Sequence, residues 1–163
     1  MSKNKNQKDK EFFMQEAINL AKESMESGQG GPFGAVVVKD GKIIGKGSNR
    51  VTIDNDPTAH AEISAIRDAC KNLNSFQLDG CDIYTSCEPC PMCLGAIYWA
   101  RPSAVYYAAT KDDAADAGFD DEFIYEEIDK PIEERKIPMK QILRKNAQLV
   151  FAGWKSKEDK IEY

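Results

Sequence analysis

The chain has 163 residues, a net charge of −5 at neutral pH and a pI near 5.0. This length fits one domain over residues 1–163 that buries its own core. The acidic balance disfavours a nucleic-acid partner, because surfaces that bind nucleic acids neutralise phosphates with Lys and Arg. No apolar run is long enough for a bilayer, so we expect no membrane association and a small-molecule partner.

The chain begins with the polar, lysine-rich segment MSKNKNQKDK, which lacks the apolar stretch of a secretory signal. We expect a cytoplasmic protein with a disordered tail over residues 1–8. Apolar positions then recur at helical spacing from Lys8 to about Ser27. The following segment, FGAVVVKDGKIIGKGSN, holds two β-branched runs around Asp40-Gly41, which predicts a β-hairpin with a two-residue turn.

The middle of the chain alternates between helix and strand. A helix is expected from DNDPTAH, where Asp56 or Thr58 would cap it, to about Asn72. CDIYTS and AVYYAAT predict strands on either side of an apolar helix, PMCLGAIYWA. After Thr110, DDAADAG and DDEFIYEEID predict short helices, IPMKQIL an edge strand and NAQLVFAGWKSK a final helix. This order indicates an α/β fold with helices covering a sheet.

Five cysteines are an odd number, and a cytoplasmic protein lacks the oxidising compartment that pairs them. Their clustering in TSCEPCPMC therefore indicates metal binding or reactive thiols. The single histidine, His60, lies in the tripeptide HAE, and the pentapeptide PCPMC follows about thirty residues later. A lone histidine is ordinarily a satisfied core or surface residue. Here it completes the H-x-E…P-C-x-x-C pattern of zinc-dependent nucleobase deaminases, in which the Glu is not a ligand.

Helix geometry supports a shared site. His60 and Glu62 do not share a lateral face of a helix, but in its first turn both side chains reach beyond its N-terminal end. Cys90 and Cys93 open the next helix in the same way, and the positive helix ends favour their thiolates. We therefore predict one Zn²⁺ on His60, Cys90 and Cys93, with a catalytic water in the open position. Glu62 would transfer protons from that water.

Cys87 leaves two alternatives open. It ends the predicted strand, so the two cysteines that open the helix are the preferred ligands. A Cys87–Cys90 pair is the first alternative, and a closed site of all three cysteines with His60 is the second. Four protein ligands would make the zinc structural and leave no position for a water.

Longer segments resemble a known family. DPTAHAEISAIR and IYTSCEPCPMCLGAIYWARP resemble the cytidine deaminase-like superfamily, and GGPFGAVVVKDGKII, AGFDDEFIYEEIDKP and the terminal Tyr163 are most similar to bacterial guanine deaminases. The resemblance covers most of residues 30–131. It implies a three-layer α/β/α sandwich around a mixed five-stranded sheet. It also implies an aminohydrolase with zinc on His60, Cys90 and Cys93 and with Glu62 as proton shuttle, which converts guanine and water to xanthine and ammonia.

The same resemblance implies substrate contacts and an assembly. Asn49 and Asp121 would hydrogen-bond the purine, with Asp121 also assisting departure of the amine. Phe33, Trp99 and Tyr163 would border the base. The resemblance further implies a homodimer that exchanges its C-terminal segment, about residues 145–163, so that Tyr163 closes the partner's site. From the residues alone, Asn49 also fits a turn, Asp121 fits a solvated acidic face no less well than Asp120 does, and Phe33 fits the core as well as a base contact.

Three other functions stay open. A tRNA adenosine deaminase shares the HAE and PCxxC motifs, but the acidic balance and the AGFDD segment speak against it. A deaminase of the same fold for guanosine or cytosine would differ only in the shape of its pocket. The third is a module in which zinc only holds the fold, and the presence of Glu62 beside His60 disfavours it.

Overall fold

The computed structural model describes residues 2–163. It divides into two compact units, Met1–Asp121 and Glu122–Tyr163, and the single domain over residues 1–163 stays a prediction. The first unit holds the sheet and the residues of the predicted zinc site. The second unit holds the C-terminal helices, and the two units are described separately.

The sheet of the first unit has four strands in the order β2-β1-β3-β4. These are β1 (Gly34–Lys39), β2 (Lys42–Ser48), β3 (Cys81–Cys87) and β4 (Ala104–Ala109). β1 is antiparallel to both β2 and β3, whereas β3 and β4 are parallel, so the sheet is mixed as predicted. The hairpin is also confirmed, because Asp40 and Gly41 have φ angles of 50° and 73°, the positive values that a type I′ turn requires.

The expected fifth strand is not among the strands of residues 2–163. The segment IPMKQIL, residues 137–143, which we predicted as an edge strand, has no regular secondary structure. Pro138 cannot donate a ladder hydrogen bond. The side chains of Ile137 and Ile142 are 77% and 80% exposed, so this segment does not bury the apolar face that stabilises a strand.

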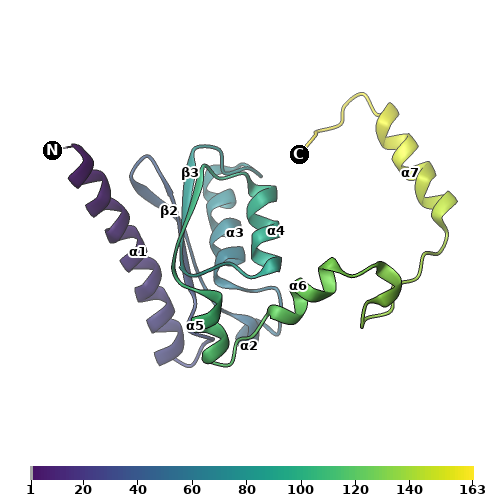
Figure 1. Ribbon diagram of the computed structural model, residues 1–163. Coiled ribbons are helices and arrows are strands. Elements are labelled where there is room, and N and C mark those ends of the chain that lie inside the picture. Colours follow the sequence, from purple (N-terminus) through teal and green to yellow (C-terminus); the bar gives the residue numbers. More distant parts are fainter. Residues whose placement is uncertain (1) are drawn as a thin grey trace. The chain divides into compact units, whose positions relative to one another are not determined.

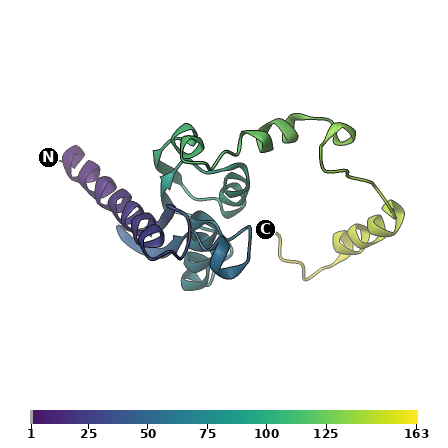
Figure 2. The same ribbon diagram turned by 90° about the horizontal axis from the view of Figure 1, so that it is seen from below.

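Helices cover both faces of the sheet and give the predicted three layers (Figures 1 and 2). Alternate residues of β1 point to opposite faces, as strand geometry requires. Val36 and Val38 pack toward α1 (Ser2–Glu26). Ala35 and Val37 pack toward α3 (Ala61–Leu73) and α4 (Pro91–Ala100), the two helices that begin at the predicted zinc ligands.

Glycines in β2 let α3 lie directly against the sheet. A Cβ atom on Gly47 would lie 2.2 Å from the carbonyl oxygen of Ala61 and 2.4 Å from the nitrogen of Ala65. A Cβ atom on Gly45 would lie 2.6 Å from the carbonyl oxygen of Ala65. Ala65 itself is fully buried. These contacts fix the first turn of α3, and with it His60, relative to the strands.

Two helix starts differ from our predictions. α1 begins at Ser2, so residues 2–8 are helical where we expected a disordered tail, and Met1 lies outside the described residues. Residues 2–26 include no Gly or Pro to interrupt the helix. The N-cap position of α3 is His60 rather than Asp56 or Thr58, and the His60 side chain makes no capping hydrogen bond. Asp56 Oδ1 instead accepts hydrogen bonds from the backbone N–H and hydroxyl of Thr58, which closes a local turn before the helix.

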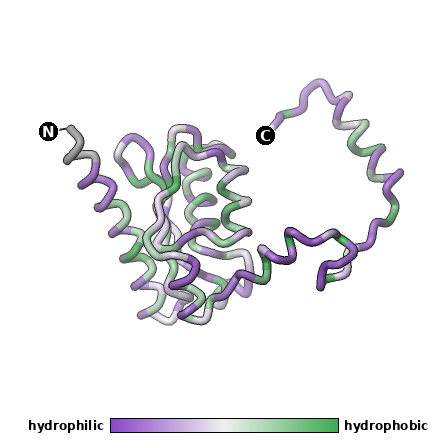
Figure 3. The backbone as a smooth tube through the Cα atoms, in the orientation of Figure 1, coloured by the Kyte–Doolittle hydropathy of each residue, from purple (hydrophilic) through white to green (hydrophobic). Residues whose placement is uncertain are grey.

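The remaining helical segments have between 3 and 13 residues. α2 (Val51–Asp54), which we did not predict, follows β2, and α5 (Lys111–Asp116) follows β4. The second unit contains α6 (Glu122–Asp129), the 3₁₀ helix η1 (Ile132–Glu134) and α7 (Arg144–Ser156). Its apolar stretches alternate with hydrophilic ones along α7 (Figure 3). Among the described helices, none is both long enough and apolar enough to cross a membrane.

Candidate zinc and substrate site

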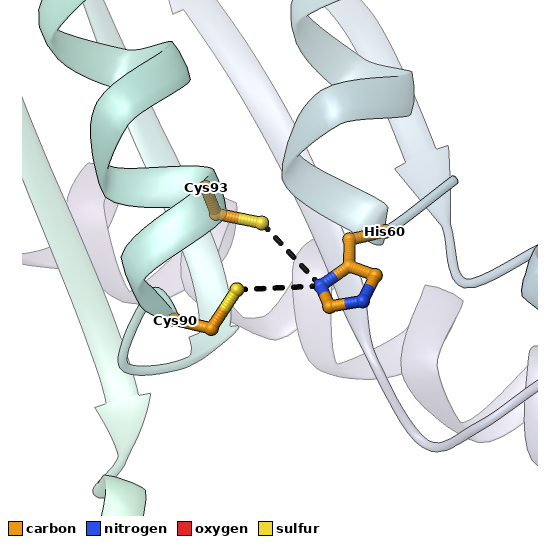
Figure 4. Close-up of side chains that lie close together, drawn as sticks. All are labelled: His60, Cys90 and Cys93. Atoms are coloured by element: carbon orange, nitrogen blue, oxygen red, sulfur yellow. Dashed lines mark hydrogen bonds between the residues drawn. The ribbon is translucent and has the colours of Figure 1, made fainter. Parts of the chain in front are cut away.

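Three side chains from two helix ends meet in one place. His60 is the N-cap of α3 and Cys90 is the N-cap of α4, and both have an extended backbone with ψ angles of 161° and 166°. His60 Nδ1 lies 3.5 Å from the Sγ atoms of both Cys90 and Cys93 (Figure 4). Their possible ligand atoms all lie within 4.8 Å of one another. The three residues predicted from spacing are therefore brought together by the fold.

This geometry fits a zinc ion. Zn–S and Zn–N bonds of about 2.3 and 2.0 Å place neighbouring tetrahedral ligand atoms about 3.5 to 3.8 Å apart. The two His60–cysteine distances of 3.5 Å are at the lower edge of this range. One nitrogen and two sulfur donors are ligands that zinc prefers, and three protein ligands leave one tetrahedral position open. The group therefore suits a catalytic zinc better than a closed structural one.

The two cysteines differ in protonation when no metal neutralises them. The pKa of Cys90 is lowered to about 4, chiefly by the hydrogen bond from Cys93 and also by the one from His60. The pKa of Cys93 is raised because it donates to Cys90, because it is buried and because Glu62 is close. The pKa of His60 is raised, mainly by its contact with Cys90. Zinc binding therefore has to displace the remaining thiol proton, which links metal affinity to pH.

Glu62 lies beside the ligands and inside the protein. Its side chain is only 6% exposed, and its Oε2 accepts a hydrogen bond from the Cys93 thiol at 3.4 Å. Burial raises the pKa of Glu62, because desolvation disfavours the carboxylate. A carboxyl whose pKa is raised takes up a proton more readily than an ordinary carboxylate does. This property suits the proton transfer that we predicted from the sequence.

Cys87 lies outside the ligand group. Its thiol donates to the carbonyl oxygen of Thr110 at 3.5 Å, and burial raises its pKa to about 11. A thiol held in this way is a poor metal ligand. The geometry therefore favours Cys90 and Cys93 over both alternatives that include Cys87.

A second set of residues lies at the end of β2 and in the loop before β1. Asn49 is 8% exposed, and its side-chain Oδ1 accepts hydrogen bonds from the backbone N–H groups of Gly31 and Val51. Phe33 packs edge-on against Phe119, with ring centroids 4.9 Å apart and an interplanar angle of 86°. We did not predict Phe119, although it lies in the AGFDD segment that we had singled out.

Asp121 is electrostatically coupled to the ligand group. The negative charge of Asp121 helps to raise the pKa of His60, and the pKa of Asp121 is itself raised, first by burial and then by Cys90. The other two residues that we predicted as substrate contacts, Trp99 and Tyr163, are exposed. Trp99 on α4 is 64% exposed, and Tyr163 belongs to the second unit and is 71% exposed. The first unit therefore groups Asp121 with the ligands and leaves the contributions of Trp99 and Tyr163 as predictions.

Comparison with known proteins agrees with this site. The model of the cytidine and deoxycytidylate deaminase zinc-binding region matches residues 7–109. Guanine deaminase from Bacillus subtilis is 61% identical over 153 residues, which cover 94% of this chain and 98% of that protein. A crystal structure of guanine deaminase from Bacillus subtilis matches with a TM-score of 0.92 over 94% of this chain and 98% of that chain.

A tRNA-specific adenosine deaminase from Aquifex aeolicus is 45% identical over 100 residues, which cover 61% of this chain and 66% of that protein. Its match thus leaves out more than a third of the present chain, whereas the similarity to the Bacillus protein extends through both units. The chain belongs to the cytidine and deoxycytidylate deaminase zinc-binding family, and within that family it groups with the guanine deaminases.

Proposed function

We propose that this protein is a zinc-dependent aminohydrolase that converts guanine and water to xanthine and ammonia. The observation that carries the proposal is the position of Glu62, a buried carboxyl in hydrogen-bond contact with one of three zinc-ligand side chains. A structural zinc site has no need for such a carboxyl. The similarity to a guanine deaminase over nearly the whole chain supports guanine as the base.

Different residues bind the metal and transfer protons in this proposal. His60, Cys90 and Cys93 hold zinc, which supplies a Lewis acid that lowers the pKa of a coordinated water toward about 7. Glu62 takes a proton from the attacking water and delivers it to a ring nitrogen. With the water oxygen bonded to C2, Glu62 would take the proton left on that oxygen and pass it to the amine, which departs as ammonia when the C2–N bond breaks. One carboxyl can serve both steps because its burial holds its pKa above the ordinary value.

The purine would be held by five residues outside the ligand group. Asn49 and Asp121 hydrogen-bond the base, and Asp121 assists the departure of the amine. Phe33 borders the ring, and its packing against Phe119 supports that role. Trp99 and Tyr163 complete the wall of the site in this proposal.

We also propose that the protein is a cytoplasmic homodimer that exchanges its C-terminal segment, about residues 145–163. The second unit supports this, because α7 leaves large apolar side chains exposed, with Leu149, Val150 and Phe151 at 73%, 73% and 69%. Apolar exposure on this scale is typical of a surface that a partner covers. In such a dimer, Tyr163 would close the site of the partner subunit.

The function is tested by zinc-dependent release of ammonia from guanine, guanosine, adenine, cytosine and cytidine, and from a tRNA anticodon stem that contains adenosine. We expect guanine to be the preferred substrate and turnover to disappear after chelation and return with zinc. Folded, zinc-loaded protein that leaves guanine intact would refute the proposal. A higher turnover of the tRNA stem than of guanine would instead assign the activity of a tRNA adenosine deaminase to the protein.

A further inference from the structure

Ser24 is a buried polar residue that the proposed reaction does not use. It lies in the last turns of α1, at a position of the helix's apolar stripe, and is therefore buried, with 4% of the residue exposed. A buried hydroxyl is costly unless it is hydrogen-bonded. Its Oγ donates to the carbonyl oxygen of Asn49 at 3.2 Å, a residue 25 positions along the chain. Ser24 therefore ties the end of α1 directly to a residue of the proposed base-binding wall.

The backbone of Ser24 shapes the loop that follows. Its carbonyl oxygen accepts the N–H groups of Gln29 at 3.1 Å and Gly30 at 3.4 Å, which folds the Gly-rich segment back over the helix end. A Cβ atom on Gly30 would lie 2.0 Å from the carbonyl oxygen of Asn49, so the loop lies against Asn49 more closely than any other residue type permits. The loop then presents the N–H of Gly31 to Asn49.

The amide of Asn49 is oriented by this arrangement. Its Oδ1 accepts the N–H of Gly31 at 3.4 Å and the N–H of Val51 at 3.3 Å, and its backbone N–H donates to the carbonyl oxygen of Phe33. With its oxygen engaged by the backbone, the side chain offers its Nδ2 as a donor to a ligand. An amide that could flip would offer donor and acceptor alternately and would discriminate less between bases.

We propose that Ser24, together with the Gly30–Gly31 loop, is a positioning device that fixes the Asn49 amide as a hydrogen-bond donor toward an acceptor atom on the purine. The proposal rests on the base-binding role of Asn49 in the proposed function. Ser24 does not touch the substrate and acts only through Asn49. It sets the affinity for the base rather than the proton transfers, which Glu62 carries out at the metal.

The test compares Ser24→Ala with Ser27→Ala. Ser27 carries the same hydroxyl three residues later, but its hydrogen bonds go to Glu23 and Ser24 within the end of α1. Ser24→Ala should raise KM for guanine about fivefold to tenfold, the effect of one hydrogen bond, while kcat changes less than about twofold and zinc content is unchanged. Ser27→Ala should leave all three unchanged. Ser24→Cys keeps a similar volume but has a weaker hydrogen-bond donor. Its KM for guanine should therefore lie between the KM of Ser24→Ala and that of Ser27→Ala.

A double-mutant cycle separates positioning from general structural support. In an Asn49→Ala background, Ser24→Ala should have almost no further effect on KM, because the amide it orients is absent. An equal effect of Ser24→Ala in both backgrounds would overturn the proposal. Equal losses of zinc and of kcat in Ser24→Ala and Ser24→Cys would do the same, because they would show that Ser24 supports the whole site.

Hydrogen exchange tests the same device without turnover. In the zinc-loaded protein, Ser24→Ala should speed exchange of the Gly31 and Val51 N–H groups about fivefold, whereas Ser27→Ala should not. If guanine is not turned over by the wild type, the proposed function fails while this measurement still decides the positioning role. Unchanged exchange rates of the Gly31 and Val51 N–H groups in Ser24→Ala would refute the positioning role of Ser24.

Discussion

His60 Nδ1 and Cys90 Sγ lie 3.5 Å apart although they cap two different helices that are thirty residues apart in the sequence. Each helix presents its first turn, and thus its partial positive charge, to the same point. The hydrogen bonds from Cys93 and His60 lower the pKa of Cys90, and a carboxyl, Glu62, lies in the first turn of the helix that starts after His60. The ligand group and the buried carboxyl beside it therefore come from two helix starts rather than from a loop.

Replacement of Glu62 by Gln should separate these two roles. Gln has nearly the same size and can still contact Cys93, so we expect one zinc per chain to remain. It cannot take up and release a proton, so kcat should fall by about a hundredfold to ten-thousandfold. Zinc content measured by atomic absorption, together with ammonia release, checks this. Glu11→Gln on α1 is the matched control, and activity in Glu62→Gln close to that of the control would refute the proton-transfer role.

Cys87→Ala should leave the zinc content intact. The Cys87 thiol bonds to the carbonyl oxygen of Thr110 and lies outside the group formed by His60, Cys90 and Cys93. Loss of this buried thiol should lower the free energy of unfolding by about 1 kcal/mol. Cys93→Ala serves as the comparison and should lose zinc. A loss of zinc in Cys87→Ala as large as that in Cys93→Ala would support the closed four-ligand site instead.

In zinc-free protein, alkylation should distinguish Cys90 from Cys87 by its pH dependence. With a pKa of about 4, Cys90 is already a thiolate at pH 6, so its labelling rate should stay flat between pH 6 and pH 8. With a pKa of about 11, Cys87 gains thiolate about tenfold for each pH unit over the same range. The lower intrinsic reactivity of a low-pKa thiolate reduces the advantage of Cys90 without changing these slopes.

Mass spectrometry of peptides from protein treated with iodoacetamide measures both rates. A labelling rate of Cys90 that rises tenfold per pH unit would contradict the thiolate assignment. Zinc should protect Cys90 and Cys93 from the reagent while leaving the rate at Cys87 unchanged, which provides an internal control.

The parts of the fold that depend on local chemistry were predictable from the sequence. Asp40-Gly41 predicted the hairpin because only a few residues adopt positive φ angles readily. The segment PMCLGAIYWA predicted α4 with its correct start, and the structure places its proline, Pro91, at the first helical position, which suits proline. The ligand group was predictable because His and Cys in this spacing have few other uses.

The parts that depend on contacts between distant segments, or on a side chain that has two possible local roles, were not predictable. The start of α3 was misplaced because Asp56 uses its carboxylate to close a turn with Thr58, and either role fits the same residue type. Ser24 and Phe119 were missed as site residues because their partners, Asn49 and Phe33, lie in other segments. The prediction of an edge strand at residues 137–143 was wrong, because a pattern of apolar residues does not show whether the face that they form will be buried.

Two glycine substitutions should have opposite effects on stability. Gly47→Ala would bring a Cβ atom within 2.2 and 2.4 Å of backbone atoms of α3, so it should destabilise the protein by about 2 kcal/mol or more. It should also weaken zinc binding, because it moves the helix that His60 caps. Gly95→Ala on α4 meets no atom within 4 Å and should stabilise the protein by about 0.5 to 1 kcal/mol. Urea titrations of the zinc-loaded variants measure both free energies of unfolding. Equal free energies of unfolding for Gly47→Ala and Gly95→Ala would contradict the close packing of α3 on β2.

The C-terminal tail gives the sharpest test of the proposed assembly. Deletion of residues 159–163 should lower guanine turnover far more than zinc content, because it removes Tyr163 but none of the zinc ligands. We then mix this truncated chain with full-length Glu62→Gln, after partial unfolding to allow exchange of subunits. We expect each to be nearly inactive alone for a different reason: one lacks the tail, and the other lacks the carboxyl that we propose as proton shuttle.

If the tail closes the partner's site, a mixed dimer contains one complete site, made from the intact Glu62 of the truncated chain and the Tyr163 of the other. Activity should then return to at most about half of the wild-type value per mixed dimer. If the tail closes its own site, every site in the mixture lacks one of the two groups, and activity should stay at the sum of the two variants. Light scattering on the same samples establishes whether dimers are present, so a monomeric protein would refute the exchange independently of turnover.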